Sequence, residues 1–216
     1  MKPVRPPRQR RSHDTLARFV GATRRLLDEK PFDKITVNEI VQEAGSSVGA
    51  FYARFRDKDA LLEHLRDVSA SEAGSERDQG PSRDWDAAPL EAVALELVRV
   101  LVKFHRSHAG TLRAVSARAI TEGRSRSGTA DAERSPHVQI ANVFRRRRGE
   151  LAHPNPDIAL HLGLRMVESA VRERVLFPEL STGSAPLTPI TDAVFVEELA
   201  RAFIGFLGVY PKDPPR

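Results

Sequence analysis

The first third of the chain carries apolar side chains at helical spacing. Residues 14–30 place one every three or four positions, which predicts a single amphipathic helix. The same period predicts a short helix after Thr36 and another after Asp57. Between these two, a further short helix is expected with Ser46 or Ser47 as its cap. The segment therefore reads as four helices in close succession.

Two of these helices are arranged as a helix-turn-helix. Thr36 is followed three residues later by Glu39, the spacing of a capping box at a helix start. The helix that begins there is expected to stop at Gly45, because glycine tolerates the left-handed conformation of a tight turn. Two short helices across a glycine turn are typical of DNA-binding proteins.

The rest of the sequence shows the same period and no alternation typical of strands. Residues 69–88 are polar and rich in turn formers, so they are expected to connect two domains. Five more helices are expected, at residues 90–106, 112–119, 138–151, 158–176 and 194–209, with a loop at 121–136. The pattern predicts an all-α chain of about nine helices.

The last two expected helices are apolar on more than one face. The side chains concerned are Leu160, Leu164, Val167 and Val171 on one helix and Phe195, Leu199, Phe203 and Phe206 on the other. A single core contact would not cover this much apolar surface. The pattern therefore predicts a dimer interface, with a thick monomeric core as the alternative.

Composition excludes several classes of protein. The 216 residues, of which 40% are hydrophobic, are enough to bury a core. No apolar run approaches the roughly 20 residues that span a bilayer, and the N-terminus lacks the apolar centre of a secretory signal, so a cytoplasmic location without membrane contact is expected. The absence of cysteine excludes disulfides, thiolate nucleophiles and thiolate metal sites.

The net charge of +5 is concentrated at the N-terminus. Residues 1–13 contain five cations and no acid, namely Lys2, Arg5, Arg8, Arg10 and Arg11. Such an arm, kept extended by its prolines, could follow DNA phosphates or enter a narrow minor groove. A solvated tail is the alternative interpretation.

The segment from Ala44 to Ala53 contains no charged residue, which is unusual for a surface helix. It offers hydroxyls, backbone amides and small apolar groups. Gly49 costs roughly 1 kcal/mol of helix propensity relative to alanine, so its backbone is expected to approach a neighbour closely. That neighbour could be DNA or the first helix.

These residues resemble the DNA-binding domain of the tetracycline-repressor (TetR) family over the stretch LLDEKPFDKITVNEIVQEAGSSVGAFYARFRDKDALL. The positions that match the family pattern are Thr36, Ala44, Gly45, Ser47, Gly49, Tyr52, Phe55, Lys58, Leu61 and Leu62. Ser46 departs from it, because the family usually has an apolar residue in the turn. The matched stretch covers about a quarter of the chain, and the remainder resembles the family only in being helical and of fitting length.

The resemblance implies a basic arm at 1–13, a three-helix DNA-binding domain at 14–70, a connection at 71–88, and a helical effector-binding and dimerisation domain at 89–216. The implied partners are a double-stranded DNA operator, a second copy of the chain and an unknown small-molecule effector, with no cofactor. The implied function is a sequence-specific regulator, most simply a ligand-responsive repressor that binds a palindromic operator as a dimer.

Roles for single residues follow from this resemblance. Phosphate contacts are expected from Thr36, Ser47, Tyr52 and Lys58, and from Arg10 and Arg11 of the arm. Base contacts are expected from Val48 and Ala50, with Ser46 and Gly49 beside them. Ser47 could contact a base instead of a phosphate, and Arg54 could contact a guanine or a phosphate. Phe51 and Phe55 are expected in the core.

The C-terminal domain supplies the remaining expected sites. In the family the last two helices form a four-helix dimer interface, which implies the residues Leu164, Val167, Val171, Phe195, Leu199, Phe203 and Phe206. The effector is expected to touch Phe104, His105, Phe144, Arg165 and Met166, chosen by helix and face.

Two rival classes find little support in the residues. An enzyme would need a site, yet His105 and His108 lack a third ligand at metal-binding spacing, so no metal site is expected. A helical adaptor that binds only proteins would leave the uncharged recognition helix and the basic arm unexplained. The run Arg145 to Arg148 could bind an anion, but such a run is more often a solvated face.

Overall fold

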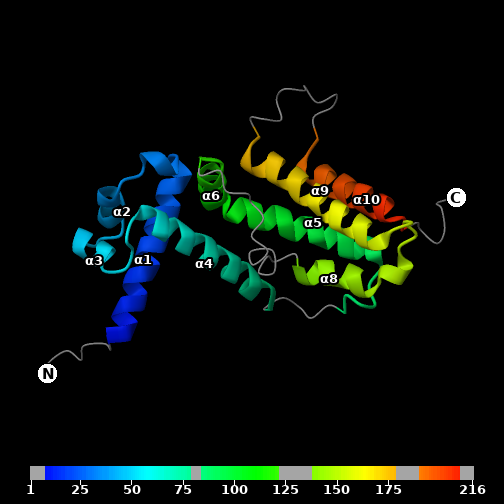
Figure 1. Cartoon of the computed structure of the whole chain (residues 1–216), viewed down its shortest axis with the longest axis horizontal. Coiled ribbons are helices and arrows are strands. Elements are labelled where there is room, and N and C mark those ends of the chain that lie inside the picture. The colour runs from blue at the N-terminus through cyan, green and yellow to red at the C-terminus, as the bar shows by residue number, and fades with distance from the viewer. Residues whose placement is uncertain (1–7, 79–83, 122–137, 179–189, 210–216) are drawn as a thin grey trace. The chain divides into compact units, whose positions relative to one another are not determined.

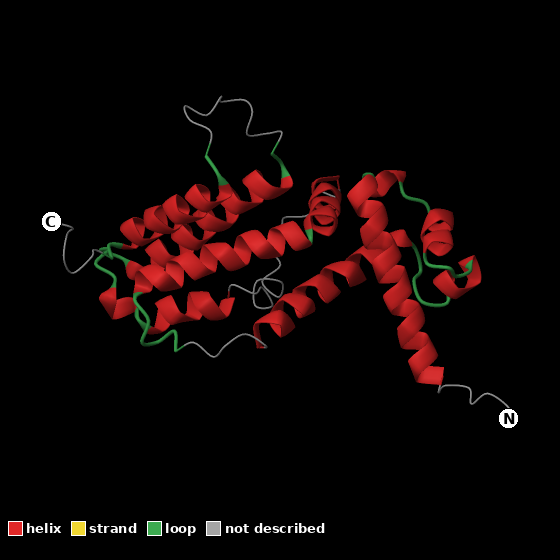
Figure 2. Cartoon of the chain, turned by 180° about the vertical axis from the view of Figure 1, so that it is seen from behind, coloured by secondary structure: helices red, strands yellow, loops and turns green. Residues whose placement is uncertain are grey.

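A computed structural model of the chain describes residues 8–78, 84–121, 138–178 and 190–209 (Figure 1). Within these ranges the chain consists of helices and loops, without a strand, and the all-α prediction is confirmed (Figure 2). None of the helices in these ranges is both long and apolar enough to cross a membrane. The chain divides into two compact units, described in turn below.

The first unit extends to Ser69 and also includes a later helix, α6. Its elements are α1 (Arg8–Glu29), η1 (Phe32–Lys34), α2 (Val37–Glu43), α3 (Val48–Tyr52), the first half of α4 (Lys58–Asp78), and α6 (Ala109–Thr121). Its core is built around three aromatic rings. The centroid of Phe19 lies 5.6 Å from that of Phe51 and 6.4 Å from that of Phe55, in edge-to-face geometry. The prediction that Phe51 and Phe55 are core residues is confirmed.

The first helix begins earlier than its apolar pattern. α1 starts at Arg8, whereas the apolar stripe predicts a start near Asp14, so the extended conformation expected for the arm does not hold for residues 8–13. Residues 8–13 contain neither glycine nor proline and are rich in arginine, a good helix former, so the helix extends without an apolar stripe. The remainder of the arm, residues 1–7, lies outside the described residues.

The fourth helix is longer than predicted. α4 continues to Asp78, through residues expected to belong to the connection. The segment 69–78 lacks proline and contains several alanines and glutamates, so polarity alone did not end the helix. The predicted loop at 121–136 lies almost entirely outside the described residues.

Helix α6 packs on the first unit through a close contact with α1. A Cβ atom at Gly110 would lie 3.0 Å from the Cβ of Leu27 and 3.1 Å from its carbonyl oxygen. Ala114, one turn further along α6, is buried in the same core as Phe19. An ion pair of 2.7 Å between Arg118 and Asp59 also ties α6 to α4.

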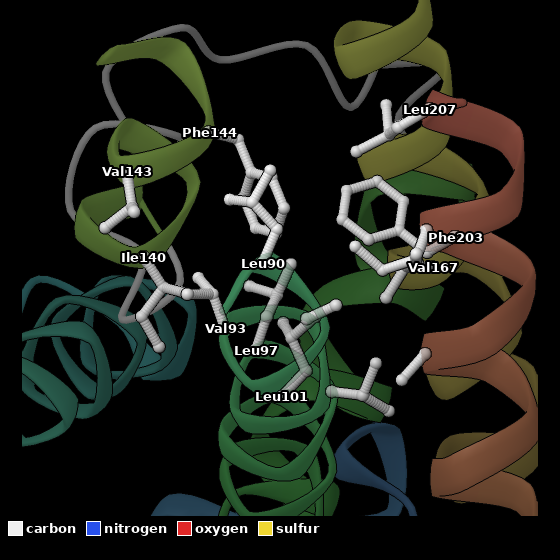
Figure 3. Packing of buried hydrophobic residues seen from close by; sticks show 14 of the residues in the cluster. Leu90, Val93, Leu97, Leu101, Ile140, Val143, Phe144, Val167, Phe203 and Leu207 are labelled. Carbon is white, nitrogen blue, oxygen red and sulfur yellow. The ribbon is translucent and has the colours of Figure 1, made fainter. Parts of the chain in front are cut away.

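The second unit is a helical bundle with α5 at its centre. Its elements are the end of α4, then α5 (Leu90–Ser107), α8 (Val138–Arg146), η2 (Arg148–Glu150), α9 (Pro156–Leu176) and α10 (Asp192–Leu207). α5 contacts α8, α9 and α10. Figure 3 shows labelled side chains of α5, α8, α9 and α10 meeting in one cluster, with the rings of Phe144 and Phe203 near each other. Leu151, predicted on the same helix as Val138, follows η2 instead.

A charged cluster joins three helices of this bundle. Asp192, in the first turn of α10, accepts hydrogen bonds from Arg106 of α5 and from Arg174 of α9. The Arg106 guanidinium, and then that of Arg174, holds the pKa of Asp192 below its usual value. Arg174 also lies over the ring of Phe195, 4.7 Å from its centroid.

Helices α9 and α10 approach each other closely at a glycine. A Cβ atom at Gly163 would lie 2.7 Å and 2.9 Å from two ring carbons of Phe203 and 3.3 Å from a ring carbon of Phe206. Phe203 cannot turn away freely, because its ring centroid lies 5.3 Å from that of buried Phe144. Only a residue without a side chain fits at this crossing.

Gly163→Ala is therefore expected to destabilise the protein, by about 1–3 kcal/mol, because the added methyl group overpacks the α9–α10 crossing. Urea denaturation followed by circular dichroism would measure the change. Gly205→Ala is the matched control, because a Cβ there meets nothing within 4 Å. It should leave stability unchanged or raise it by up to about 1 kcal/mol through helix propensity. Equal effects of the two changes would show that the crossing can relax.

Candidate nucleic-acid interface

The turn between α2 and α3 has the hydrogen bonds of a helix end closed by glycine. Gly45 has a φ of +57°, in the left-handed region that favours glycine. The amide of Ser46 donates to the carbonyl of Val41 at 2.8 Å, and the amide of Gly45 donates to that of Gln42 at 3.1 Å. This pair of bonds is a Schellman motif, in which Ser46 occupies the position that often makes an apolar contact. The predicted glycine turn is confirmed.

Both helices of the motif have the caps that the sequence predicts. Thr36 accepts a hydrogen bond from the amide of Glu39 at 3.3 Å, and the Glu39 carboxylate accepts one from the amide of Thr36 at 2.9 Å. This is a complete capping box. Of the two candidate serines, Ser47 caps α3, because its hydroxyl accepts a hydrogen bond from the amide of Ala50 at 3.2 Å.

Helix α3 has one inward residue and an outward face of small and polar groups. Phe51 is completely buried, whereas the side chain of Val48 is 40% exposed and that of Tyr52 is 55% exposed. A Cβ atom at Gly49 would meet nothing within 4 Å. Close packing against α1 therefore does not explain Gly49, and its approach to DNA stays a prediction. The rings of Tyr52 and Phe51 lie edge-to-face, with centroids 5.4 Å apart.

Arg54 is folded back on the recognition helix. Its Nη1 atom donates to the carbonyl of Ala50 at 3.0 Å, at the C-terminal end of α3. A guanidinium there stabilises the negative end of the helix dipole. Ala50 is half-buried beneath this contact.

Two cations of α1 and Lys30, the residue that directly follows this helix, contact the short helix α2 and its turn. Arg18 donates to the carbonyl of Gly45 at 3.0 Å, Arg25 pairs with Glu43 at 2.6 Å, and Lys30 pairs with Glu39 at 2.5 Å. The sequence pattern did not indicate these residues, although Arg18 and Arg25 are seven residues apart and so lie on one face of α1. Their contacts hold α2 and its turn in position, and they are not among the predicted DNA contacts.

Lys58 lies at the start of α4 and is directed at backbone carbonyl groups. Its ammonium donates to the carbonyls of Phe32 and Ile35, each at 3.1 Å, and approaches that of Asp33 at 3.4 Å. It also lies 4.8 Å from the centroid of the Phe32 ring. In this structure the ammonium is thus held by η1.

Two family models match this chain. One, described as bacterial regulatory proteins, tetR family, matches residues 19–65, which contain the motif described above. The other, described as tetracyclin repressor-like, C-terminal domain, matches residues 89–207, more than half of the chain. The chain belongs to the tetR family of bacterial regulatory proteins. It is therefore a DNA-binding transcriptional regulator, and the resemblance found in the sequence is confirmed.

Individual relatives agree with this assignment. The chain is 37% identical over 102 residues to the HTH-type transcriptional repressor Rv1474c of Mycobacterium tuberculosis, and the match covers 42% of this chain and 54% of that protein. The chain thus matches about half the length of this curated relative. A solved structure of a TetR family transcriptional regulator from Vibrio parahaemolyticus, 21% identical, covers 90% of this chain and 98% of its own with a TM-score of 0.55. This likeness supports the tetR fold.

Some of the residues predicted for the dimer interface are buried in the core of the second unit of this tetR-family chain. Val167, Val171 and Phe203 are buried in the core of the second unit. Four others are only partly buried and pack against that core, namely Leu164, Phe195, Leu199 and Phe206. The outward apolar side chains of the same helices are different ones, Ile158, Leu162, Met166 and Val194, each at least 41% exposed.

The structure separates the five predicted effector residues. Phe144 belongs to the buried core, and His105 is buried with Nδ1 2.9 Å from the carbonyl of Leu101. Burial lowers the pKa of His105, which keeps its ring neutral near pH 7. Phe104 is half-buried, with its ring centroid 4.8 Å from that of His108. Arg165 and Met166 lie on the exposed face of α9, because Gly163, Val167 and Val171 take its inward face.

The arginine run at the end of α8 has structural partners. Arg146 donates twice to Asp86, at 3.0 Å and 2.7 Å, while Arg147 pairs with Glu150 and donates to the carbonyl of Ala88. The hydrogen bonds to Glu150 are the main reason that the pKa of Arg147 is raised. The run therefore anchors the segment that precedes α5. Among the described residues, no group of three or more histidine, aspartate or glutamate side chains is placed to hold a metal ion.

The capping box should make stability depend on pH. The hydrogen bond from Lys30, and then those from Thr36, lower the pKa of Glu39 from 4.5 to about 2. Because the folded-state pKa is the lower one, the ionised carboxylate stabilises the fold above about pH 4.5, and this contribution is lost as the pH falls towards 2. Glu39→Gln should thus be less stable than the unmodified protein at pH 7, with the difference shrinking between pH 4.5 and pH 3. Urea denaturation of both proteins over this range would test it, and a constant difference would contradict it.

Proposed function

We propose that this chain is a sequence-specific repressor that binds a palindromic operator as a dimer and responds to a small-molecule effector. The observation that carries the proposal is the outward face of α3. It exposes Val48, an open Gly49 and Tyr52, while Phe51 anchors the helix from behind. A surface without charged side chains can enter the major groove closely and present its methyl groups to base edges.

The outward residues of the motif suit two kinds of contact with DNA. Val48 is the first residue of α3, with Ala50 half-buried on the same helix. Val48 is proposed to contact a thymine methyl group. The Ser47 hydroxyl uses an acceptor site for its cap, so its proton remains available to a phosphate or base. Tyr52 is 55% exposed, and its hydroxyl is proposed to reach a phosphate. Ser46 and Arg54 lie at the two ends of this surface, and Arg10 and Arg11 on the first turns of α1 would add backbone contacts.

The hydroxyl of Thr36 already donates to Glu39, at 2.9 Å. A phosphate contact at this position would therefore use backbone amides of the first turn of α2, which lack intrahelical partners. The side chain of Thr36 would then serve mainly as the cap.

Dimerisation is proposed through the outward face of α9 and α10. Ile158, Leu162 and Met166 are spaced four residues apart, so they form one exposed apolar stripe on α9, with Val194 exposed on α10. The predicted residues Leu164, Phe195, Leu199 and Phe206 would lie at the margin of this face. A two-fold dimer would offer two recognition helices to the half-sites of a palindrome.

An effector is proposed to bind in the second unit, the part matched by the C-terminal family model. Phe104 and His105 are the favoured contacts among the predicted residues, because they are at least half-buried and carry polar or aromatic groups. The neutral ring of His105 could accept a hydrogen bond from such a ligand through Nε2.

Selection of duplexes from a random pool by the purified full-length protein tests the proposal directly. Recovery of a motif with two-fold symmetry, retained against excess competitor DNA in an electrophoretic shift, is the expected result. Retention of unrelated duplexes with equal affinity would contradict sequence-specific binding.

Base reading and phosphate contact should be separable within α3. Val48→Ala removes two methyl groups, so it should cost on the order of 1 kcal/mol at one operator position and leave affinity for random DNA nearly unchanged. Tyr52→Phe deletes only a hydroxyl, so it should weaken binding to selected and random duplexes alike. Titration of each variant with both duplexes would decide. If Tyr52→Phe lost discrimination and Val48→Ala did not, the two roles would be reversed.

The dimer face can be tested without disturbing the core. Leu162 is 47% exposed, so Leu162→Glu should leave the fold intact and yield monomers in sedimentation, because it places a charge within an apolar interface. Affinity for the selected duplex should fall with it, since two half-sites are no longer joined. Ile120→Glu is the control, an exposed apolar residue of α6 in the first unit. A Leu162→Glu variant that stays dimeric would place the interface elsewhere.

A further inference from the structure

The turn between α2 and α3 has a polar residue where its motif often has an apolar one. In a Schellman motif the second residue beyond the helix frequently packs an apolar side chain on the third-from-last residue of the helix. Ser46 and Val41 occupy these two positions, and their backbone groups share the 2.8 Å hydrogen bond of the turn. Val41 is buried and apolar, but Ser46 is half-buried and carries a hydroxyl. Its single methylene group offers little apolar surface for this contact.

Arg18 of α1 supplies a polar contact to the same turn. Its Nη1 atom donates to the carbonyl of Gly45 at 3.0 Å, although the two residues are 27 positions apart in the sequence. The guanidinium thereby lies at the C-terminal end of α2, where a cation stabilises the negative end of the helix dipole. Its Nη2 atom donates to the hydroxyl of Thr15 at 3.4 Å, a contact that helps to keep the guanidinium directed at the turn.

The residue next to Arg18 holds the other helix of the motif. Phe19 is completely buried, and its ring packs edge-to-face on that of Phe51 in α3. Two adjacent residues of α1 therefore contact α3 through the core and the turn before it through an exposed side chain. Because α3 has only five residues, the direction in which it leaves α2 depends on these contacts.

We propose that Arg18 is a positioning residue, which holds the turn of the helix-turn-helix in place of the apolar contact that Ser46 does not make. A charged side chain on the surface of α1 thus performs the task of a buried apolar one. The inference rests on the proposed function only for its effect on DNA binding. Its effect on the turn is a property of the free protein and is measured without DNA.

Arg18→Met tests the contact in the free protein. Methionine keeps an unbranched stem and a similar helix propensity, while it removes the charge and the donors. Hydrogen exchange of the Gly45 and Ser46 amides, followed by NMR, should become about threefold to tenfold faster, the range expected for one hydrogen bond. Arg25→Met is the matched control, because it removes the same charge from the same face of α1 and breaks a bond to Glu43 instead. Equal acceleration by both variants, or none in Arg18→Met, would overturn the proposal.

Ser46→Val restores the apolar contact and gives the decisive comparison. Among the described residues only glycines have a positive φ, so the backbone of Ser46 is compatible with a branched side chain. Valine offers an isopropyl group to Val41, as in the common form of the motif. Arg18→Met should therefore accelerate the exchange of the Gly45 amide less than about twofold in the Ser46→Val background. Equal acceleration in both backgrounds would overturn the proposal, since independent contacts are additive.

Affinity for the selected duplex is then compared among the unmodified protein, the two single variants and the double variant, at a temperature where circular dichroism shows all four folded. Arg18→Met should weaken binding about tenfold, or about threefold for each half-site. In the Ser46→Val background the same change should weaken binding at most about twofold. Any contact of Ser46 with DNA is lost equally in both backgrounds, so it cancels from this comparison.

Two results of the affinity comparison would contradict the proposal. Unaltered binding by Arg18→Met would show that the turn needs no such support. A loss of equal size in both backgrounds would make Arg18 itself a contact of DNA. If the unmodified protein selects no duplex, the proposed function fails, while amide exchange in the four free proteins still decides the role of Arg18 at the turn.

Discussion

A helix of five residues cannot hold its own shape in water, and α3 is such a helix. Its position depends on the ring of Phe51, which is fully buried against Phe19 of α1 and Phe55 before α4. Because one large side chain faces inward, the remaining positions of α3 are free to be small or polar. The recognition surface is therefore available for DNA only because the aromatic core behind it is rigid.

Polar contacts hold the other helix of the motif, α2. Helix α2 has only seven residues, and it and its turn are held by Arg18 and Arg25 of α1 and by Lys30, which follows α1. Exposed ion pairs of this kind contribute little stability individually. Their importance lies in geometry, since each bonds a different point of α2 or its turn. Lys58 adds the contact to η1, so two lysines lie against the start of α2, Lys30 after α1 and Lys58 at the first position of α4.

In the second unit, α9 and α10 each bury one apolar face in the core and leave other apolar side chains exposed. Gly163 allows the two helices to approach closely, and the ring of Phe203 fills the space that results. Asp192 then joins the bundle at one end through its two arginine partners. The apolar stripe of α9 stays outside this packing, which makes it available to a second copy of the chain.

The sequence by itself determined the helices, the turn and the family. Caps and glycine turns depend on residues close in the chain, so Thr36, Gly45 and Ser47 could be predicted from local spacing. Tertiary structure decided which face of each helix is exposed. The apolar spacing shows that α9 and α10 each carry apolar faces. Only packing decides that Phe203 of α10 is buried in the core and that Met166 of α9 is exposed. It also decided the partners of Lys58, because those carbonyls lie more than twenty residues away and backbone atoms leave no mark in a sequence.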